Sequence, residues 1–173
     1  KIVNELDAGP IYASFNVDIE DNDFFQAEEK LLETSLMHIS SVINQIVANN
    51  KQPEEQNGKE VTYAEKIDRG DGLVNWSWGA KEIKNKFLAY KKWPVLSFMF
   101  KNEEVQIHDL EIASDQAGAL GVIAEFTKDS LRVSCSDGVI KIKAVKFPGK
   151  KVISSIDFFN AKRDIISSGD ILV

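Results

Sequence analysis

The chain has 173 residues, of which 43% are apolar and 28% charged, and this composition is typical of a folded globular protein rather than a disordered or fibrous one. No apolar run is long enough for a transmembrane helix, and the single cysteine, Cys135, excludes an internal disulfide. The formal net charge of −6 argues at first sight against a nucleic-acid partner.

The charge is distributed unevenly along the chain. Residues 1–80 carry nine more acidic than basic side chains, whereas residues 81–173 carry three more basic than acidic ones. Such an asymmetry predicts two units with different partners, so the second half can bind nucleic acid although the whole chain is acidic. A solvated lysine-rich surface is the alternative explanation of the same excess.

The first half predicts one strand and one long helix. Residues 11–19 alternate apolar with small or polar side chains, which is typical of a strand with one buried face. The segment 21–23 (DND) supplies N-cap oxygens for a helix that ends near Asn50. We expect that helix to bury one stripe of side chains. The stripe consists of Phe24, Ala27, Leu31, Leu32, Ser35, Leu36, Ile39, Val42, Ile43, Ile46 and Val47.

A polar and turn-rich segment, 51–60, then predicts a linker. A second helix is expected to begin at Ser77 or Gly79. Its inner face combines Ile83, Phe87 and Tyr90, which recur at helical spacing.

After residue 94 the apolar pattern changes to a period of two. Short strands are expected at 95–100, 105–113, 120–127, 131–136 and 138–147. The Asp137-Gly138 step between the last two favours a type I′ hairpin turn. Five short strands in so short a segment predict a small barrel, which closes to remove its edges. Ser154 and Asp157 have the spacing of a helix capping pattern and predict a final helix through Ile165.

Few residues offer a recognisable chemistry. Residues 148–151 (PGKK) lack the glycine spacing and the Ser or Thr of a phosphate-binding P-loop. His38 is interpreted as a partly buried structural histidine and His108 as a solvent-facing one, and no nucleophile lies near either in the sequence. Asp7 precedes a tight turn at the end of a strand, where α/β sheets place catalytic groups, although a carboxylate there also serves simply to hold the turn.

Four parts of the chain resemble, in the same order, the formyltransferases that use 10-formyltetrahydrofolate. They are 6–11 (LDAGPI), 62–67 (TYAEKI), 71–76 (DGLVNW) with 93–94 (WP), and 147–151 (FPGKK). The last of them resembles the QPxGKK stretch in the C-terminal domain of the methionyl-tRNA formyltransferase family. This chain has Lys92 and Phe147 where that family often has proline and glutamine, so the match rests more on the glycine-lysine turn.

The resemblance implies an α+β chain made of the tail of a Rossmann-like formyltransferase α/β domain, a linker and an OB-like β-barrel C-terminal domain. It assigns 1–50 to the remnant of the catalytic domain, 51–80 to the linker and 81–173 to the barrel. Because the chain opens at Lys1 without methionine, we expect an upstream catalytic half in the whole protein. The family's Asn-x-His motif does not occur in this sequence, so we expect the chain alone to be inactive.

The resemblance also implies the reaction, which is formyl transfer from 10-formyltetrahydrofolate to the α-amine of methionyl initiator tRNA in translation initiation. Asp7 matches the family's catalytic aspartate, and Leu6 and Asp7 border the folate; no metal is implied. The candidate tRNA-binding side chains are basic and lie in the linker or the predicted barrel: Lys66, Lys84, Lys86, Lys91, Lys92, Lys143, Lys150, Lys151, Lys162 and Arg163. We expect a cytoplasmic monomer whose partners are initiator tRNA and folate, without a membrane.

Two alternatives remain at this point. A sugar-amine formyltransferase shares the Asp-x-Gly loop and the linker motif but acts on a nucleotide sugar, and the basic second half argues against it. A stand-alone OB-like binding module, in which the first strand and helix serve packing only, has no activity. A tRNA-binding assay distinguishes a sugar-amine formyltransferase from a methionyl-tRNA formyltransferase. A formyl-transfer assay of the chain tests the stand-alone module.

Overall fold

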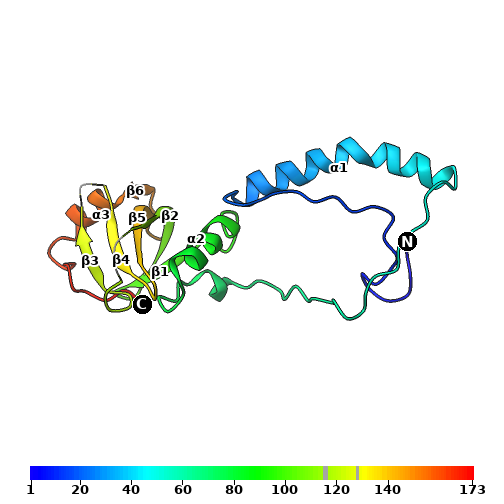
Figure 1. Cartoon of the computed structure of the whole chain (residues 1–173). Coiled ribbons are helices and arrows are strands. Elements are labelled where there is room, and N and C mark those ends of the chain that lie inside the picture. Colours follow the sequence, from blue (N-terminus) through cyan, green and yellow to red (C-terminus); the bar gives the residue numbers. More distant parts are fainter. Residues whose placement is uncertain (115–116, 128) are drawn as a thin grey trace. The chain divides into compact units, whose positions relative to one another are not determined.

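The computed structural model describes residues 1–114, 117–127 and 129–173. They form two compact units, Lys1–Lys66 and Ile67–Val173 (Figure 1). The division falls inside the segment 51–80 that is expected to be the linker. Residues 67–80 therefore belong to the second compact unit, and the barrel boundary expected at residue 81 lies within that unit.

The first unit consists of α1, Phe24–Val47, with extended segments on either side. Asp23 begins this helix as predicted, because its carboxylate accepts hydrogen bonds from the N–H groups of Phe25 and Gln26. The strand predicted at 11–19 is wrong, since the described backbone there makes an isolated bridge between Ile11 and Glu54 and is otherwise irregular. A strand needs a neighbour to accept and donate its backbone hydrogen bonds, and the described part of this unit provides none beyond that bridge.

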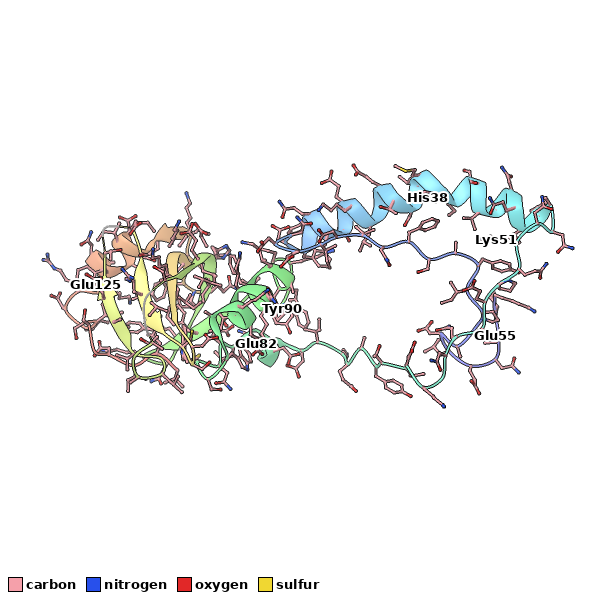
Figure 2. All side chains as sticks on the ribbon, in the orientation of Figure 1. His38, Lys51, Glu55, Glu82, Tyr90 and Glu125 are labelled. Atoms are coloured by element: carbon pink, nitrogen blue, oxygen red, sulfur yellow. The ribbon has the colours of Figure 1, made fainter. Side chains whose placement is uncertain are left out.

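Helix α1 is amphipathic, yet the stripe predicted to be buried is mostly exposed, and its other members, Phe24, Ala27, Val42 and Ile46, are half-buried. All residues of α1 are described, and none of them is buried (Figure 2). Leu36, for example, keeps 66% of its surface exposed. His38 is half-buried because its ring stacks on Phe15, with centroids 4.0 Å apart. The prediction is wrong because an apolar stripe is buried only where another element packs against it.

The second unit contains a curled antiparallel half-barrel sheet. Its strands are β1 Ser97–Phe100, β2 Glu103–Ala113, β3 Ile123–Phe126, β4 Leu131–Ser134, β5 Val139–Lys146 and β6 Val152–Ser154. The strand order is β1-β2-β5-β4-β3, and β6 pairs with β5 (Figure 1). The end of the chain joins the two outer strands, because Ile123 N–H in β3 donates to the carbonyl of Asp170 and Val173 N–H donates to that of Met99 in β1. The five predicted strands thus correspond to β1–β5, whereas β6 is additional.

The turns between strands differ from the expectation in one respect. Lys101 and Asn102 have φ values of 44° and 68°, so the type I′ turn joins β1 to β2. The hairpin predicted at Asp137-Gly138 forms between β4 and β5, but the type I′ geometry predicted for it is wrong because neither residue has a positive φ. The connection there spans four residues, closed by Cys135 N–H donating to the Gly138 carbonyl.

Two helices pack against the sheet. Helix α2, Ala80–Ala89, has Gly79 as its N-cap, which is one of the two starts predicted from the sequence. It buries Ile83 and Phe87. Helix α3, Ser155–Lys162, begins as predicted, because the Ser154 hydroxyl accepts a hydrogen bond from Asp157 N–H. It ends before the predicted Ile165, and it buries Phe158 in the core.

The segment before α2 is part of this core. A 3₁₀ turn, Arg69–Gly72, precedes Val74 and Trp76, both of which are buried. A Cβ atom on Gly72 would lie 2.6 Å from the Val95 carbonyl oxygen and 3.0 Å from Pro94 Cγ, so only glycine fits. This close approach gives the DGLVNW and WP motifs a shared structural role.

Candidate nucleic-acid interface

The turn after β5 carries two exposed lysines and begins at the buried residue Phe147. Lys150 N–H donates to the Phe147 carbonyl over 3.0 Å, and Gly149 has a φ of 67°. With Pro148 at the second position and a positive φ at the third, this is a type II turn. Phe147 is buried in the core, whereas Lys150 and Lys151 are exposed. The turn therefore fixes the backbone position of two exposed positively charged residues.

Two of the predicted lysines lie over aromatic rings near α2. Lys86 Nζ lies 4.5 Å from the centroid of the Trp78 ring, and Lys91 Nζ lies 3.7 Å from that of Phe87. Lys91 also donates to the carbonyl of His108 over 3.3 Å. These contacts occupy part of the hydrogen-bonding and cation–π capacity of both ammonium groups. Lys84 and Lys92 have interaction partners as well.

Two further predicted lysines form ion pairs on the sheet. Lys143 pairs with Glu111 on the neighbouring strand. Lys162 Nζ, at the end of α3, lies 3.7 Å from Glu103. Because a nearby carboxylate already offsets each charge, these lysines contribute less to an outward-facing positive potential than unpaired ones do.

The remaining predicted cations are exposed. Lys66 closes the first unit, and Arg163 follows α3. For the side chains of Lys150, Lys151 and Arg163 the described part of the chain shows no hydrogen-bond, ion-pair or ring partner. The structure thus separates the predicted set into paired lysines and a smaller group, centred on the type II turn, whose charge is available.

Lys146 joins that available group, although it is outside the predicted set. Ile142 and Val145 are both fully buried although they are three residues apart, so the alternation of β5 breaks between them. The register of β2 against β5 shifts at the same level, around Asp109. The irregularity turns Lys146 to the outer face, whereas strict alternation would put it opposite to Lys143.

A hollow of about 220 Å³ lies beside the lysine turn. Its lining consists of Arg69, Glu104, Gln106, Lys146, Phe147, Pro148 and Gly149. Arg69 Nη2 lies 2.6 Å from Glu104 Oε2, and the Ser97 hydroxyl donates to Glu104 Oε1 over 3.0 Å. Both carboxylate oxygens of Glu104 are therefore occupied by donors from within the protein.

His108 lies close to Gln106, one of the residues that line this hollow. Its Nε2 is 3.5 Å from Gln106 Oε1. Partial burial lowers the pKa of His108 below its usual value, and the positive charges of Lys146 and Lys91 lower that pKa further. The prediction of a solvent-facing histidine is thus refined, because the ring is half-buried and surrounded by cations.

Asp7 lies in an exposed loop of the first unit. It has a φ of 56°, and the Gln56 side chain donates to the carbonyls of Asp7 and Gly9 over 2.8 and 2.7 Å. Leu6 is 92% exposed, and a hollow of about 530 Å³ is lined by residues from 1 to 12. No hydrogen-bond or ion-pair partner of the Asp7 carboxylate is found among the described residues.

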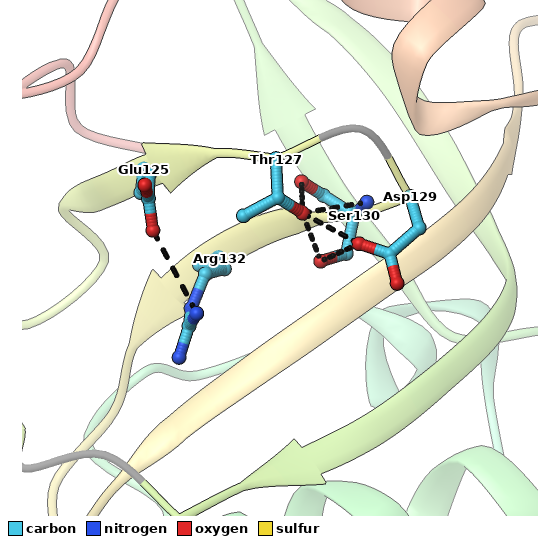
Figure 3. Close-up of polar contacts among 5 residues, drawn as sticks. All are labelled: Glu125, Thr127, Asp129, Ser130 and Arg132. Carbon is cyan, nitrogen blue, oxygen red and sulfur yellow. Dashed lines mark hydrogen bonds and ion pairs between the residues drawn. The ribbon is translucent and has the colours of Figure 1, made fainter.

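A polar cluster at the β3–β4 connection satisfies itself internally. The Thr127 hydroxyl donates to Asp129 over 2.6 Å and lies 2.9 Å from the Ser130 hydroxyl (Figure 3). The hydrogen bond from Thr127 is the main reason why the pKa of Asp129 is lowered. Arg132 and Glu125 form an ion pair at 3.6 Å. Because these groups bind one another, we interpret the cluster as structural.

Two further observations concern metal sites and membrane-spanning helices. Within 1–114, 117–127 and 129–173 no three His, Cys, Asp or Glu side chains come together as a metal site would require. Of the helices formed by these residues, none has the length and apolar character needed to cross a membrane.

Comparison with known proteins identifies the class of this chain. Residues 66–163 match the family model described as "Formyl transferase, C-terminal domain". The chain therefore belongs to the formyltransferase C-terminal domain family. The matched region covers the 3₁₀ turn, the sheet, both helices of the second unit and the lysine turn.

The similar curated proteins include methionyl-tRNA formyltransferases, so the resemblance predicted from the sequence is confirmed. The protein of this name from Sulfurihydrogenibium sp. is 34% identical over 160 residues, which are 91% of this chain and 51% of the relative. The one from Caldicellulosiruptor saccharolyticus is 32% identical over 183 residues, covering 99% of this chain and 55% of the relative. The chain thus spans about half the length of the curated relatives it matches.

Solved structures of HypX from Aquifex aeolicus share the fold. A multiply substituted HypX variant has a TM-score of 0.61 at 17% identity, with coverage of 98% of this chain and 31% of that chain. HypX in complex with tetrahydrofolic acid has a TM-score of 0.60 at 16% identity, with coverage of 99% and 32%. At these identities the similarity concerns the architecture alone.

Proposed function

We propose that this chain is the tRNA-binding C-terminal part of a methionyl-tRNA formyltransferase. The whole enzyme would transfer the formyl group of 10-formyltetrahydrofolate to the α-amine of methionyl initiator tRNA. The family match and the names of the relatives support this proposal. The structural observation that carries it is the type II turn at Pro148-Gly149, which presents Lys150 and Lys151 from a buried anchor.

The domain assignment forms part of the proposal. Residues 1–50 would be the remnant of the catalytic domain, 51–80 the linker and 81–173 the OB-like barrel. The antiparallel sheet, whose outer strands are joined by the last residues of the chain, supports the barrel assignment. A cytoplasmic location and a monomeric state are the corresponding expectations for the whole enzyme.

The basic turn would contact the sugar-phosphate backbone of the tRNA. Each phosphate that a lysine neutralises releases counterions, so the binding constant falls as salt rises. Lysines already paired with carboxylates, such as Lys143 with Glu111, would contribute less. We therefore centre the footprint on Lys150 and Lys151, with Arg163 as a further candidate.

In the first unit, Asp7 would serve the chemical step. The amine nitrogen attacks the formyl carbon, a new C–N bond forms, and the bond from that carbon to the folate nitrogen breaks as the folate nitrogen takes up a proton. Asp7 would accept the proton that the amine loses, directly or through a water. Its free carboxylate supports this role, and the exposed Leu6 beside it would border the folate. Because the Asn-x-His motif does not occur in this sequence, we expect no formyl transfer by the chain alone.

Binding to initiator methionyl-tRNA tests the proposal. We expect Lys150→Ala with Lys151→Ala to reduce the magnitude of the negative slope of log K against log salt by about 1.8 and to lower the affinity at 0.15 M salt about 30-fold, since each phosphate contact contributes about −0.9 to the slope. Lys51→Ala with Lys59→Ala is the matched control, because it removes the same charge outside the proposed footprint. If the unmodified chain binds no tRNA, the proposal fails and a sugar-amine substrate has to be tested. An unchanged slope removes the turn from the footprint.

A further inference from the structure

The hollow beside the lysine turn contains groups with a common chemistry. It is about 220 Å³ in volume and lies between the Arg69 side chain, the outer face of β2 and β5, and the type II turn. We refer to this hollow as the Arg69 groove, and its hydrogen-bond donors are the side chains of Arg69, Gln106 and Lys146. Three separate segments contribute these residues, namely the 3₁₀ turn, β2 and β5.

Arg69 keeps most of its donors for an outside partner. Its Nη2 contacts Glu104 Oε2 at 2.6 Å, and the side chain is otherwise 80% exposed. The second oxygen of Glu104 accepts from Ser97, so this carboxylate is committed within the protein. Glu104 thus orients the guanidinium group, whose remaining N–H groups can donate elsewhere.

Gln106 also keeps its side-chain N–H donors for an outside partner. Its Oε1 is the atom close to His108 Nε2, at 3.5 Å. With the amide oxygen directed at a ring nitrogen, the two N–H donors of Gln106 remain available. Lys146, in register with Gln106 across the strands, adds an ammonium group for which no partner is described among the residues in the structure.

The Arg69 groove therefore offers guanidinium, amide and ammonium N–H groups together, while its one carboxylate is already engaged. A ligand that suits this set has several acceptor oxygens and a negative charge, which is the chemistry of a phosphate group. Lys150 and Lys151 follow immediately after the groove residues Pro148 and Gly149, so the groove is continuous with the proposed tRNA footprint.

We propose that the Arg69 groove binds one backbone phosphate of the tRNA, next to the phosphates that Lys150 and Lys151 contact. This inference rests on the proposed function for the identity of the ligand. It assigns a binding role to Arg69, Gln106 and Lys146, three residues outside the predicted set.

The test compares Lys146→Met with Lys141→Met in the chain. Both changes remove one charge from the outer face of β5 and keep most of the apolar stem, but Lys141 does not line the groove. We expect Lys146→Met to reduce the magnitude of the negative slope of log K against log salt for initiator tRNA by about 0.9. The affinity at 0.15 M salt should fall about fivefold. Lys141→Met should leave the slope unchanged. Equal thermal midpoints for the two variants show that folding is intact.

A titration with inorganic phosphate separates the groove from the proposed function. We expect phosphate to shift the side-chain amide NMR signals of Gln106 in the unmodified chain and to shift them much less in Lys146→Met. If these shifts occur but no tRNA binds, the groove is an anion site and the proposed function is wrong. If tRNA binds and Lys146→Met keeps the full slope, the Arg69 groove is not part of the footprint and the inference is overturned.

Discussion

The carboxylate of Asp137 accepts a hydrogen bond from the backbone N–H of Ala80 over 2.7 Å, although the two residues are 57 positions apart. Gly79, the N-cap of α2, has no side chain to do this. The β4–β5 hairpin thereby caps the first turn of the helix and places a negative charge at its positive end. The contact couples helix α2 to the sheet.

We therefore expect Asp137→Ala to destabilise the second unit by about 1 kcal/mol, the usual cost of a lost N-cap. Asp137→Asn is the matched control, because it keeps an acceptor oxygen and should lose less. Urea unfolding, followed by the fluorescence of the buried Trp76, measures both changes. Equal stability of Asp137→Ala and the unmodified chain would contradict a capping role.

The close approach of Gly72 to the Trp93-Pro94 segment gives a second prediction. A Cβ atom at Gly72 would meet backbone, the Val95 carbonyl oxygen at 2.6 Å, which cannot move without disturbing the core. We expect Gly72→Ala to cost about 1–3 kcal/mol, as overpacking does. Gly138→Ala is the control, because its Cβ would lie 3.7 Å from Ala80 Cβ, an ordinary contact. Thermal unfolding of both variants checks the difference, and similar midpoints would show that the segment adapts.

These two contacts illustrate which features can be predicted from the sequence. The caps at Asp23 and Ser154 are local, so the residue type and spacing were sufficient to predict both helix starts. Asp137 caps α2 across the fold, and nothing near Gly79 in the sequence indicates it. The predicted strand at 11–19 failed for a related reason, since a strand also needs a paired neighbour, and beyond the Ile11–Glu54 bridge the described residues of the first unit provide none.

The candidate site likewise contains residues that local sequence patterns predict and residues that depend on distant contacts. The lysine turn was predictable, because proline followed by glycine favours a type II turn between structured segments. The role of Lys146 was not, since it depends on a register shift between β2 and β5 that no residue pattern marks. The resemblance assigns Arg69 to the linker, whereas its segment reaches the sheet through the packing of Gly72 against Val95 and through a backbone hydrogen bond from Val74 N–H to the Ser97 carbonyl.

His108 predicts a dependence of stability on pH. Burial and the charges of Lys146 and Lys91 lower its pKa in the folded chain below the usual value near 6.5. As the pH falls through 6.5, the unfolded chain therefore binds the proton first, so the folded state loses stability until the lower pKa is passed. We expect His108→Gln to lose less stability than the unmodified chain between pH 7 and pH 5, as measured by thermal midpoints.

An NMR titration of the imidazole signals provides the control for that prediction. The pKa of His108 should lie below 6.5 in the unmodified chain and move upward in Lys146→Met, because one nearby positive charge is removed. Besides Lys146 and Lys91, the uncharged Gln106 lies close to the ring, and Tyr90 lines the same small hollow as His108. A pKa at or above 6.5 would contradict the assignment of burial and neighbouring cations as the cause.

The last prediction concerns Asp7 and requires the full-length protein. We expect Asp7→Asn to reduce formyl transfer by about 10²–10⁴-fold, because the amide accepts no proton from the attacking amine. The thermal midpoint should not change, since no stabilising contact of the Asp7 carboxylate is described in the structure. Glu5→Gln is the matched control, as it neutralises another exposed acid of the same loop and should keep full activity. Turnover of Asp7→Asn at the rate of the unmodified protein would remove Asp7 from the mechanism and leave the loop with a structural role.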